Sequence, residues 1–224
     1  MTVSTSNTDG CDTIYANNIT FVRWTITNGD DSISQKANST NIHISNCTFH
    51  NGLGVAIGSI GQYNDTFEYI ENVTAKDIVT YGTKYVAYVK TWTGVAKGYP
   101  PNGGGGGIGY ASNLHFSNFT THNNTGIFAI TQCTSYNGAT GGCDTSLFNI
   151  HNISLTGVTG TVADTDVVAV LQCSAASPCR GVSIEGVRLT DMVNGTVPAE
   201  YLCDSVVAPQ GFGCTGPVGG QNSD

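Results

Sequence analysis

The sequence predicts an all-β protein, a single-stranded, right-handed parallel β-helix. Two observations favour this fold class: a short apolar pattern that recurs along the chain, and a composition rich in turn-forming residues. Of 224 residues, 29 are glycine, 39% are hydrophobic and 11% are charged, which is too apolar for a disordered chain. No apolar run approaches the roughly 18 residues of a membrane span, so no membrane partner is expected.

The recurring pattern reads apolar, any, apolar, any, turn-former, apolar. Copies begin at residues 42, 73, 114, 153 and 182, and their turn-formers are Asn46, Asp77, Asn118, Gly157 and Gly186. An earlier copy, which begins at Ile19, carries Arg23 at the turn position. Alternation places two side chains on one face of a strand, and Asn, Asp or Gly accepts the left-handed conformation of a tight bend. Each copy is therefore expected to be two short strands joined by a one-residue bend.

The spacing between copies predicts stacked coils. Its shortest value, 23 residues between positions 19 and 42, is about one coil of a β-helix, and longer spacings accommodate loops. Parallel stacking would bury the apolar faces in one continuous core. An antiparallel β-sandwich is the competing fold, and it is less favoured because hairpin signals are few.

We expect residues 1–200 to form the β-helix and residues 201–224 to form a disulfide-bound C-terminal cap. No capping element precedes the first copy, so the β-helix is expected to be the C-terminal portion of a longer domain. Eight cysteines indicate an oxidising compartment, and three pairs are spaced to close short loops: Cys133 with Cys143, Cys173 with Cys179, and Cys203 with Cys214. The sequence leaves the pairing of Cys11 and Cys47 open. C-x-x-C pairs are missing, so zinc is not expected. No other metal and no cofactor are expected.

Charge and glycosylation sequons limit the partners. The formal net charge is −8 with 8 Lys and Arg, which disfavours nucleic acid and anionic membranes. An acidic polysaccharide would be repelled at long range, so each cation near a candidate site carries weight. Nine N-x-S/T sequons favour a secreted, extracellular, N-glycosylated protein, which we expect to be a monomer: Asn18, Asn38, Asn46, Asn64, Asn72, Asn118, Asn123, Asn152 and Asn194. The alternative is that asparagine is frequent for backbone reasons.

An acidic cluster is the leading candidate for chemistry. Asp9 and Asp30 lie about one coil apart, so Asp9 is expected beside Asp30 at a step of about 4.8 Å, with Asp31 next to them. Gly29 permits the bend that lets both Asp30 and Asp31 face outward. Three close carboxylates cannot all ionise freely, and one raised pKa supplies the acid of an acid–base pair. The alternative is that both segments are ordinary turn sequences.

Two glycine-rich segments attract attention. Gly52, Leu53 and Gly54 open a run in which a ligand can approach the backbone closely, and a tight turn is the alternative. Gly103–Gly107 follow a proline-containing segment at 98–102, and together they predict a long flexible loop that serves as a lid or a spacer.

Lys90 is the candidate cation for a sugar carboxylate. It is one of the few cations in the chain, and Tyr88 and Trp92 lie on either side of it. A lysine flanked by aromatic side chains suits an acidic sugar, and a solvent-exposed strand lysine is the alternative.

Taken in order, these motifs resemble glycoside hydrolase family 28, the pectin-degrading polygalacturonases and their relatives. They stand as NTDG at 7–10, GDD at 29–31, GLGVAIGS at 52–59 and YVK at 88–90, so the likeness covers essentially the whole chain. The resemblance implies a parallel β-helix and inverting hydrolysis, in which acid and base lie about 6.5–9.5 Å apart. It also implies that Asp30 is the general acid, that Asp9 and Asp31 activate the water, and that Lys90 binds a substrate carboxylate.

Three positions depart from the family pattern. Leu53 replaces the histidine of its GHG segment, Tyr88 replaces the arginine of its RIK segment, and the tyrosine of many polygalacturonases is missing around Thr125. His50 is not expected to replace the lost histidine. The segments GLGVAIGSIGQY, YVKTWTG and GYPPNGGGGG resemble a fungal exo-acting subgroup. Its members are assigned as galacturan 1,4-α-galacturonidases or rhamnogalacturonan-directed exo-hydrolases.

The resemblance thus predicts an exo-acting hydrolase that releases galacturonate from galacturonan ends. The nearest alternative acts on rhamnogalacturonan, where Leu53 and Tyr88 would accept a less charged sugar. A polysaccharide lyase would need a basic group beside the aspartates, and Arg23 lies in a strand pattern instead. A catalytically inactive, carbohydrate-binding fragment is the third possibility.

Overall fold

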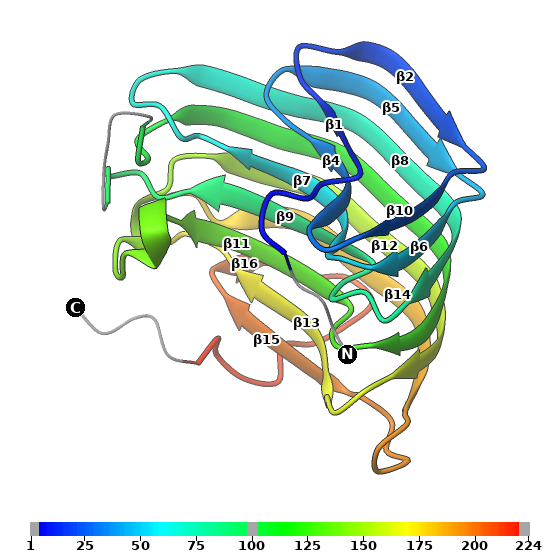
Figure 1. Cartoon of the computed structure of the whole chain (residues 1–224). Coiled ribbons are helices and arrows are strands. Elements are labelled where there is room, and N and C mark those ends of the chain that lie inside the picture. The colour runs from blue at the N-terminus through cyan, green and yellow to red at the C-terminus, as the bar shows by residue number, and fades with distance from the viewer. Residues whose placement is uncertain (1–4, 98–102, 220–224) are drawn as a thin grey trace.

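The computed structural model describes residues 5–97 and 103–219, and it confirms an all-β solenoid of parallel strands (Figure 1). Sheet A has seven strands, in the order β1 (Cys11–Thr13), β4 (Asp31–Gln35), β7 (Gly54–Ile60), β9 (Ala87–Trp92), β11 (Phe128–Thr134), β13 (Val167–Gln172) and β15 (Glu200–Asp204). Successive coils therefore add one strand each to this sheet.

Sheet B has nine strands and forms the other long wall of the solenoid. Its main path runs β16 (Val206–Val207), β14 (Cys179–Asp191), β12 (Asn149–Val162), β10 (Ile108–Asn124), β8 (Phe67–Tyr81), β5 (Ser39–Ser45) and β2 (Asn17–Val22). The short strands β3 (Thr25–Asn28) and β6 (Thr48–Asn51) continue it beside β8. Two 3-10 turns at Tyr136–Gly138 and Cys143–Thr145 are the helical elements among the described residues, and no helix there is long and apolar enough to cross a membrane.

The strand register confirms the repeat. The first apolar residues of the six copies pair in series, each with the equivalent residue of the next coil: Ile19, Ile42, Val73, Leu114, Ile153 and Val182. Most of these side chains are buried in one continuous apolar core that also takes Ile33, Val55 and Phe128 from sheet A. The coil is the structural unit, and its apolar face is buried by its neighbours rather than within itself.

The one-residue bends have positive φ in every copy. Asn46 (φ 53°), Asp77 (φ 56°) and Asn118 (φ 56°) adopt the left-handed conformation, as do the two glycines at the same position. Arg23 adopts it as well, with φ 59°, although its side chain favours it poorly. The stacked coils impose the bend on Arg23, because the neighbouring copies fix the path of the backbone.

An asparagine ladder runs along the outside of sheet B. The Nδ2 atoms of Asn41, Asn72, Asn113 and Asn152 each donate to the Oδ1 of the asparagine one coil earlier, at 2.8, 3.1, 3.0 and 2.6 Å, and the ladder begins at Asn17. Seven of the nine sequon asparagines also have positive φ. Backbone and ladder demands therefore account for much of the asparagine content.

The three short-loop disulfides form as predicted, linking Cys133 with Cys143, Cys173 with Cys179, and Cys203 with Cys214. Cys11 and Cys47 are both free, the first half-buried and the second buried. A boundary between residues 200 and 201 falls inside β15, which pairs with β13, so the last coil continues past it. The Cys203–Cys214 disulfide then ties the following segment to that coil.

The glycine tract is packed, which corrects the expectation of a flexible loop for this part. Gly104–Gly107 are buried, and the amides of Gly105, Gly106 and Gly107 donate to Gln62, Thr93 and Gly61 carbonyl oxygens at 2.8–3.1 Å. A Cβ on Gly107 would lie 2.5 Å from the Cα of Gly61. Glycine is needed here because two backbone segments touch. Residues 98–102 of the predicted loop lie outside the described residues.

Replacing Arg23 by glycine should stabilise the protein. Glycine carries no Cβ to oppose the left-handed bend, and Gly157 and Gly186 already occupy the equivalent turns. We expect the free energy of unfolding in urea to rise by about 1 kcal/mol.

Thr156→Gly provides the control for Arg23→Gly, because Thr156 is exposed within the extended part of β12. There glycine should lower stability. Equal losses in both variants would contradict the strain assigned to Arg23.

Candidate active site

The three aspartates meet at the corner between sheets B and A. Strand β3 ends at Asn28 and β4 begins at Asp31, so Asp30 lies in the turn between the sheets. Asp9 comes from the preceding coil. One carboxylate oxygen from each of Asp9, Asp30 and Asp31 lies within 4.8 Å of the others. The structure therefore brings together the acidic residues that coil spacing placed side by side.

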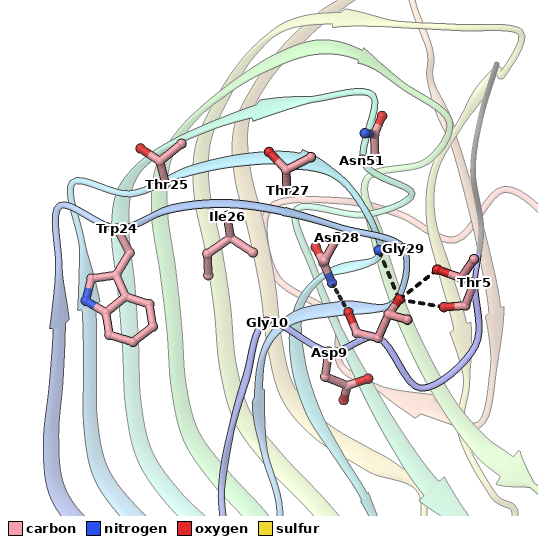
Figure 2. Close-up of a pocket in the computed structure, with 11 residues that line it drawn as sticks. Thr5, Asp9, Gly10, Trp24, Thr25, Ile26, Thr27, Asn28, Gly29 and Asn51 are labelled. Atoms are coloured by element: carbon pink, nitrogen blue, oxygen red, sulfur yellow. Dashed lines mark hydrogen bonds between the residues drawn. The ribbon is translucent and has the colours of Figure 1, made fainter.

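Asn28 and Gly29 hold the two coils together at this corner (Figure 2). The Asn28 Nδ2 lies 3.1 Å from the Thr8 carbonyl oxygen, and 2.7 and 2.8 Å from those of Asp30 and Asp31. The Gly29 amide donates to Thr8 Oγ1 at 3.2 Å. Gly29 is buried, and its missing Cβ leaves room for Thr5, whose Oγ1 a Cβ would approach to 2.3 Å. The turn that carries Asp30 is thus fixed from both sides.

Asp31 is buried and held by cations and a phenol. Its side chain is 1% exposed, and Lys90 Nζ donates to its Oδ2 at 2.9 Å. Tyr88 donates its hydroxyl to Asp31 Oδ1, and Lys36 Nζ lies 3.5 Å from Asp31 Oδ2. Burial, followed by the charge of Asp31, raises the pKa of Tyr88, so the phenol remains a donor. A buried carboxylate needs such partners, because an unpaired one is strongly disfavoured.

Tyr88 and Lys90 reach Asp31 across an intervening strand. Both lie on β9, whereas Asp31 starts β4, and β7 runs between these strands. Ala56 and Gly58 of β7 pair directly with Tyr88 and Lys90, and their small side chains leave space above the sheet. Tyr88 packs on Ala56 in a small apolar cluster. Small residues on β7 therefore permit the contact.

Asp30 is oriented by the backbone. The Asp31 amide donates to its Oδ1 at 2.9 Å, and the Asn7 amide donates to its Oδ2 at 2.7 Å. The side chain is half-buried, and its two oxygens are fixed by groups from two successive coils.

Asp9 holds a proton more readily than an ordinary carboxyl group. Burial, followed by the negative charge of Asp31, raises the pKa of Asp9 to about 6, and Lys36 opposes the shift. Asp9 also borders an open hollow of about 450 Å³ together with Asn7, Asp12 and Lys36. The cluster thus contains one carboxyl group that changes its charge in the mildly acidic range.

Lys36 and Asp12 belong to this site and were not singled out from the sequence. Lys36 Nζ lies 3.5 Å from Asp9 Oδ2 and 3.8 Å from Asp12 Oδ2, in addition to its contact with Asp31. Ile33 points into the core, so strand alternation places residue 36 on the outer face. This alternation could have predicted from the sequence that Lys36 lies on the same face as the aspartates.

The other predicted binding residues lie close by but are packed against protein. The Leu53 amide donates to the Asp30 carbonyl at 2.8 Å, and its side chain packs with Tyr88. A Cβ added to Gly52 would meet Asn28 and Asp30, and one added to Gly54 would meet Tyr85, so both positions need glycine. Trp92 is 8% exposed, and His50 stacks on Tyr81 with centroids 4.9 Å apart.

Parallel coils stack into a solenoid that carries a cluster of three carboxylates at one corner between its sheets. The model of glycosyl hydrolases family 28 matches residues 2–209. The chain therefore belongs to glycosyl hydrolases family 28.

The names of the curated relatives describe several glycosidase activities. The chain is 52% identical to "Alpha-L-rhamnosidase rgxB" of Aspergillus niger over 96% of its length, and 36% identical to "Putative galacturan 1,4-alpha-galacturonidase A" of Aspergillus niger over 89%. It is 29% identical to "Exopolygalacturonase X-1" of Emericella nidulans over 89%. It covers 50, 49 and 46% of these proteins, so it spans about half the length of the curated relatives it matches.

Solved structures support the fold. The endo-xylogalacturonan hydrolase of Aspergillus tubingensis aligns with a TM-score of 0.77 at 23% identity, over 96% of this chain and 55% of its own. The family 28 exopolygalacturonase of Yersinia enterocolitica aligns with a TM-score of 0.57 at 16% identity, over 94% of this chain and 39% of its own.

Asp9→Asn should raise the melting temperature at pH 7 more than at pH 4. The folded-state pKa of about 6 lies above the ordinary 3.8, so ionisation of Asp9 disfavours the fold and stability falls as pH rises between these values. Asparagine removes that charge. Thermal melts at both pH values test this, with exposed Asp65→Asn as the control. An equal shift at both pH values would count against the buried charge.

Proposed function

We propose that the chain carries the acid–base site of an exo-acting glycoside hydrolase that acts on the pectic polysaccharide rhamnogalacturonan. The clustering of Asp9, Asp30 and Asp31 carries this proposal, because glycoside hydrolysis needs a proton donor and a base on either side of one bond. The match to the family supports the reaction class. In this proposal the full protein binds an acidic polysaccharide.

Each aspartate takes a distinct role in this proposal. Asp30, held by two backbone amides, protonates the glycosidic oxygen. Asp9 lies at the open hollow and accepts the proton of the attacking water. Asp31 is held by Tyr88 and Lys90, and it orients that water with Asp9.

We propose that the terminal sugar is neutral, with α-L-rhamnose as the leading candidate. Lys36 and Lys90 are the cations beside the aspartates among the described residues, and both are paired with carboxylates, which weakens their attraction for a sugar carboxylate. Leu53 adds an apolar surface next to Tyr88, which suits a deoxy sugar. The 52% identity to a relative named an α-L-rhamnosidase supports this choice.

Release of terminal galacturonate is the second candidate. Relatives named galacturan 1,4-alpha-galacturonidases, at 36 and 34% identity, favour it. Exposed Lys84, with its Nζ 5.2 Å from the Tyr85 ring, is the nearby cation without a carboxylate partner among the described residues. Lys84 could meet a galacturonate at either end of the cleaved bond, and Tyr85 packs beside Leu53.

The stereochemical outcome of hydrolysis, inversion or retention at the anomeric carbon, depends on the spacing of the carboxyl groups. One oxygen from each carboxylate lies within 4.8 Å of the others, whereas the range of roughly 6.5–9.5 Å for inverting enzymes refers to the separation of the two carboxyl groups. Family resemblance implies inversion. The anomeric configuration of the first product, followed by NMR, decides between an inverting site that closes around water and a retaining one.

The substrate proposal predicts free rhamnose as the first product. Rhamnogalacturonan oligosaccharides with terminal rhamnose and polygalacturonate should be incubated separately with the wild type, Asp30→Asn and the control Asp65→Asn. Rhamnose should appear with the wild type and the control, and Asp30→Asn should lower the rate at least 100-fold.

Each of the other possible product patterns contradicts one part of this proposal. Galacturonate monomers from polygalacturonate would favour the second candidate over the release of rhamnose. A ladder of oligomers would contradict exo action. Binding without any product would mean that the described coils form a carbohydrate-binding piece that lacks activity.

The role of Asp9 as a base predicts a pH profile. A base must be ionised, so kcat/KM should fall as pH drops through about 6. Lys36 lowers the pKa of Asp9, so Lys36→Met should move this limb to higher pH. A limb that instead falls with rising pH near 6 would make Asp9 the proton donor.

A further inference from the structure

A hollow on the outer side of sheet B has no lining residue in common with the aspartate cluster. It has a volume of about 690 Å³, which is within the range of ligand sites, and it is lined by Tyr15, Ala16, Asn17, Asn38, Thr40, Asn41 and Tyr69. These residues come from three successive coils. Tyr15 is 73% exposed, so its ring is accessible at the edge of the hollow.

Two tyrosines flank the hollow on either side of Asn38. The Tyr15 amide donates to the Ala37 carbonyl at 2.9 Å, which places Tyr15 beside Asn38 on the preceding coil. Tyr69 lies on the following coil, where its carbonyl accepts from the Asn38 amide at 2.7 Å. Tyr110 stacks on Tyr69 with centroids 5.6 Å apart, so the Tyr69 face toward Asn38 remains for another group.

Asn38 presents its amide nitrogen to this hollow. Its Oδ1 accepts from the Tyr69 amide at 3.1 Å, which fixes the orientation of the carboxamide. Its Nδ2 donates to no partner among the described residues, and Asn38 lines the hollow. The sequence Asn38-Ser39-Thr40 is a glycosylation sequon, and Nδ2 is the atom that such a modification joins to a sugar.

Four of the other eight sequon asparagines use Nδ2 in hydrogen bonds. The Nδ2 atoms of Asn72 and Asn152 donate within the asparagine ladder, and those of Asn64 and Asn118 donate to Asp65 and Asp77. Asn38 thus combines a donor without a partner with an adjoining hollow flanked by aromatic rings.

We propose that Asn38 carries an N-linked glycan whose first N-acetylglucosamine packs in the hollow between Tyr15 and Tyr69. The C–H face of a pyranose is apolar and stacks on aromatic rings, while its hydroxyl and acetamido groups form hydrogen bonds. Asn17 and Asn41 offer amide groups at the edge of the hollow. The glycan covers exposed Tyr15 and half-buried Tyr69 and links three coils.

The test compares the chain secreted from yeast with the chain made in bacteria, which attach no such glycan. Thr40→Ser keeps a sequon and the hydroxyl that donates to Asn17, whereas Thr40→Val removes both. Glycopeptide mass spectrometry should find Asn38 occupied in the yeast-made wild type and Thr40→Ser, and unmodified in Thr40→Val.

Thermal melts test the packing. In yeast-made protein, the melting temperature of the wild type should exceed that of Thr40→Val. This difference should be about 2–4 °C larger than the difference between the same two proteins made in bacteria. Tyr69→Leu should keep the glycan but lose this extra difference. Folded yeast-made protein with Asn38 unmodified would overturn the site, and an unchanged difference in Tyr69→Leu would overturn the packing.

Discussion

The parallel hydrogen-bond register between coils is the constraint on which the rest of the structure depends. Each coil repeats the path of its neighbour at a step of about 4.8 Å, so residues in equivalent positions of successive coils lie side by side. The series from Ile19 to Val182 shows this in the core. The same register brings Asp9 to the turn that carries Asp30 and Asp31, and it aligns the asparagines into a ladder. Core, surface and site are therefore consequences of one alignment.

The site concentrates negative charge in a chain that already carries a net charge of −8. Asp31 tolerates burial because Lys36, Lys90 and Tyr88 surround it, and removing one partner of such a group leaves the other uncompensated. Burial, followed by the negative charge of Asp31, raises the pKa of Asp9, and Lys36 opposes this shift. Lys36 and Lys90 neutralise part of the negative charge of the aspartates and so stabilise the acidic cluster. Few other cations are then available to bind a substrate.

The sequence was sufficient for features that depend on period. The β-helix, the pairing of the copies and the three short disulfide loops all follow from spacing, and the structure has them. Contacts that depend on how far a side chain reaches could not be predicted from the sequence. Lys90 meets Asp31 across β7, and Lys36 joins three aspartates, because the intervening residues are small or the strand phase turns outward. The glycine tract was misjudged since its glycines serve close backbone contact rather than flexibility.

The path of Tyr88 over Ala56 has an evolutionary consequence. The residue at position 88 reaches the buried aspartate only while position 56 stays small, and Leu53 and Ala129 complete the same apolar cluster. Positions on four strands or turns thus form one epistatic unit. A lineage that changes its preferred sugar through position 88 must change the neighbouring coils in step, and a single substitution would first lose the support of Asp31. Diversification of such solenoids is then expected to proceed by coordinated replacements along a column of coils.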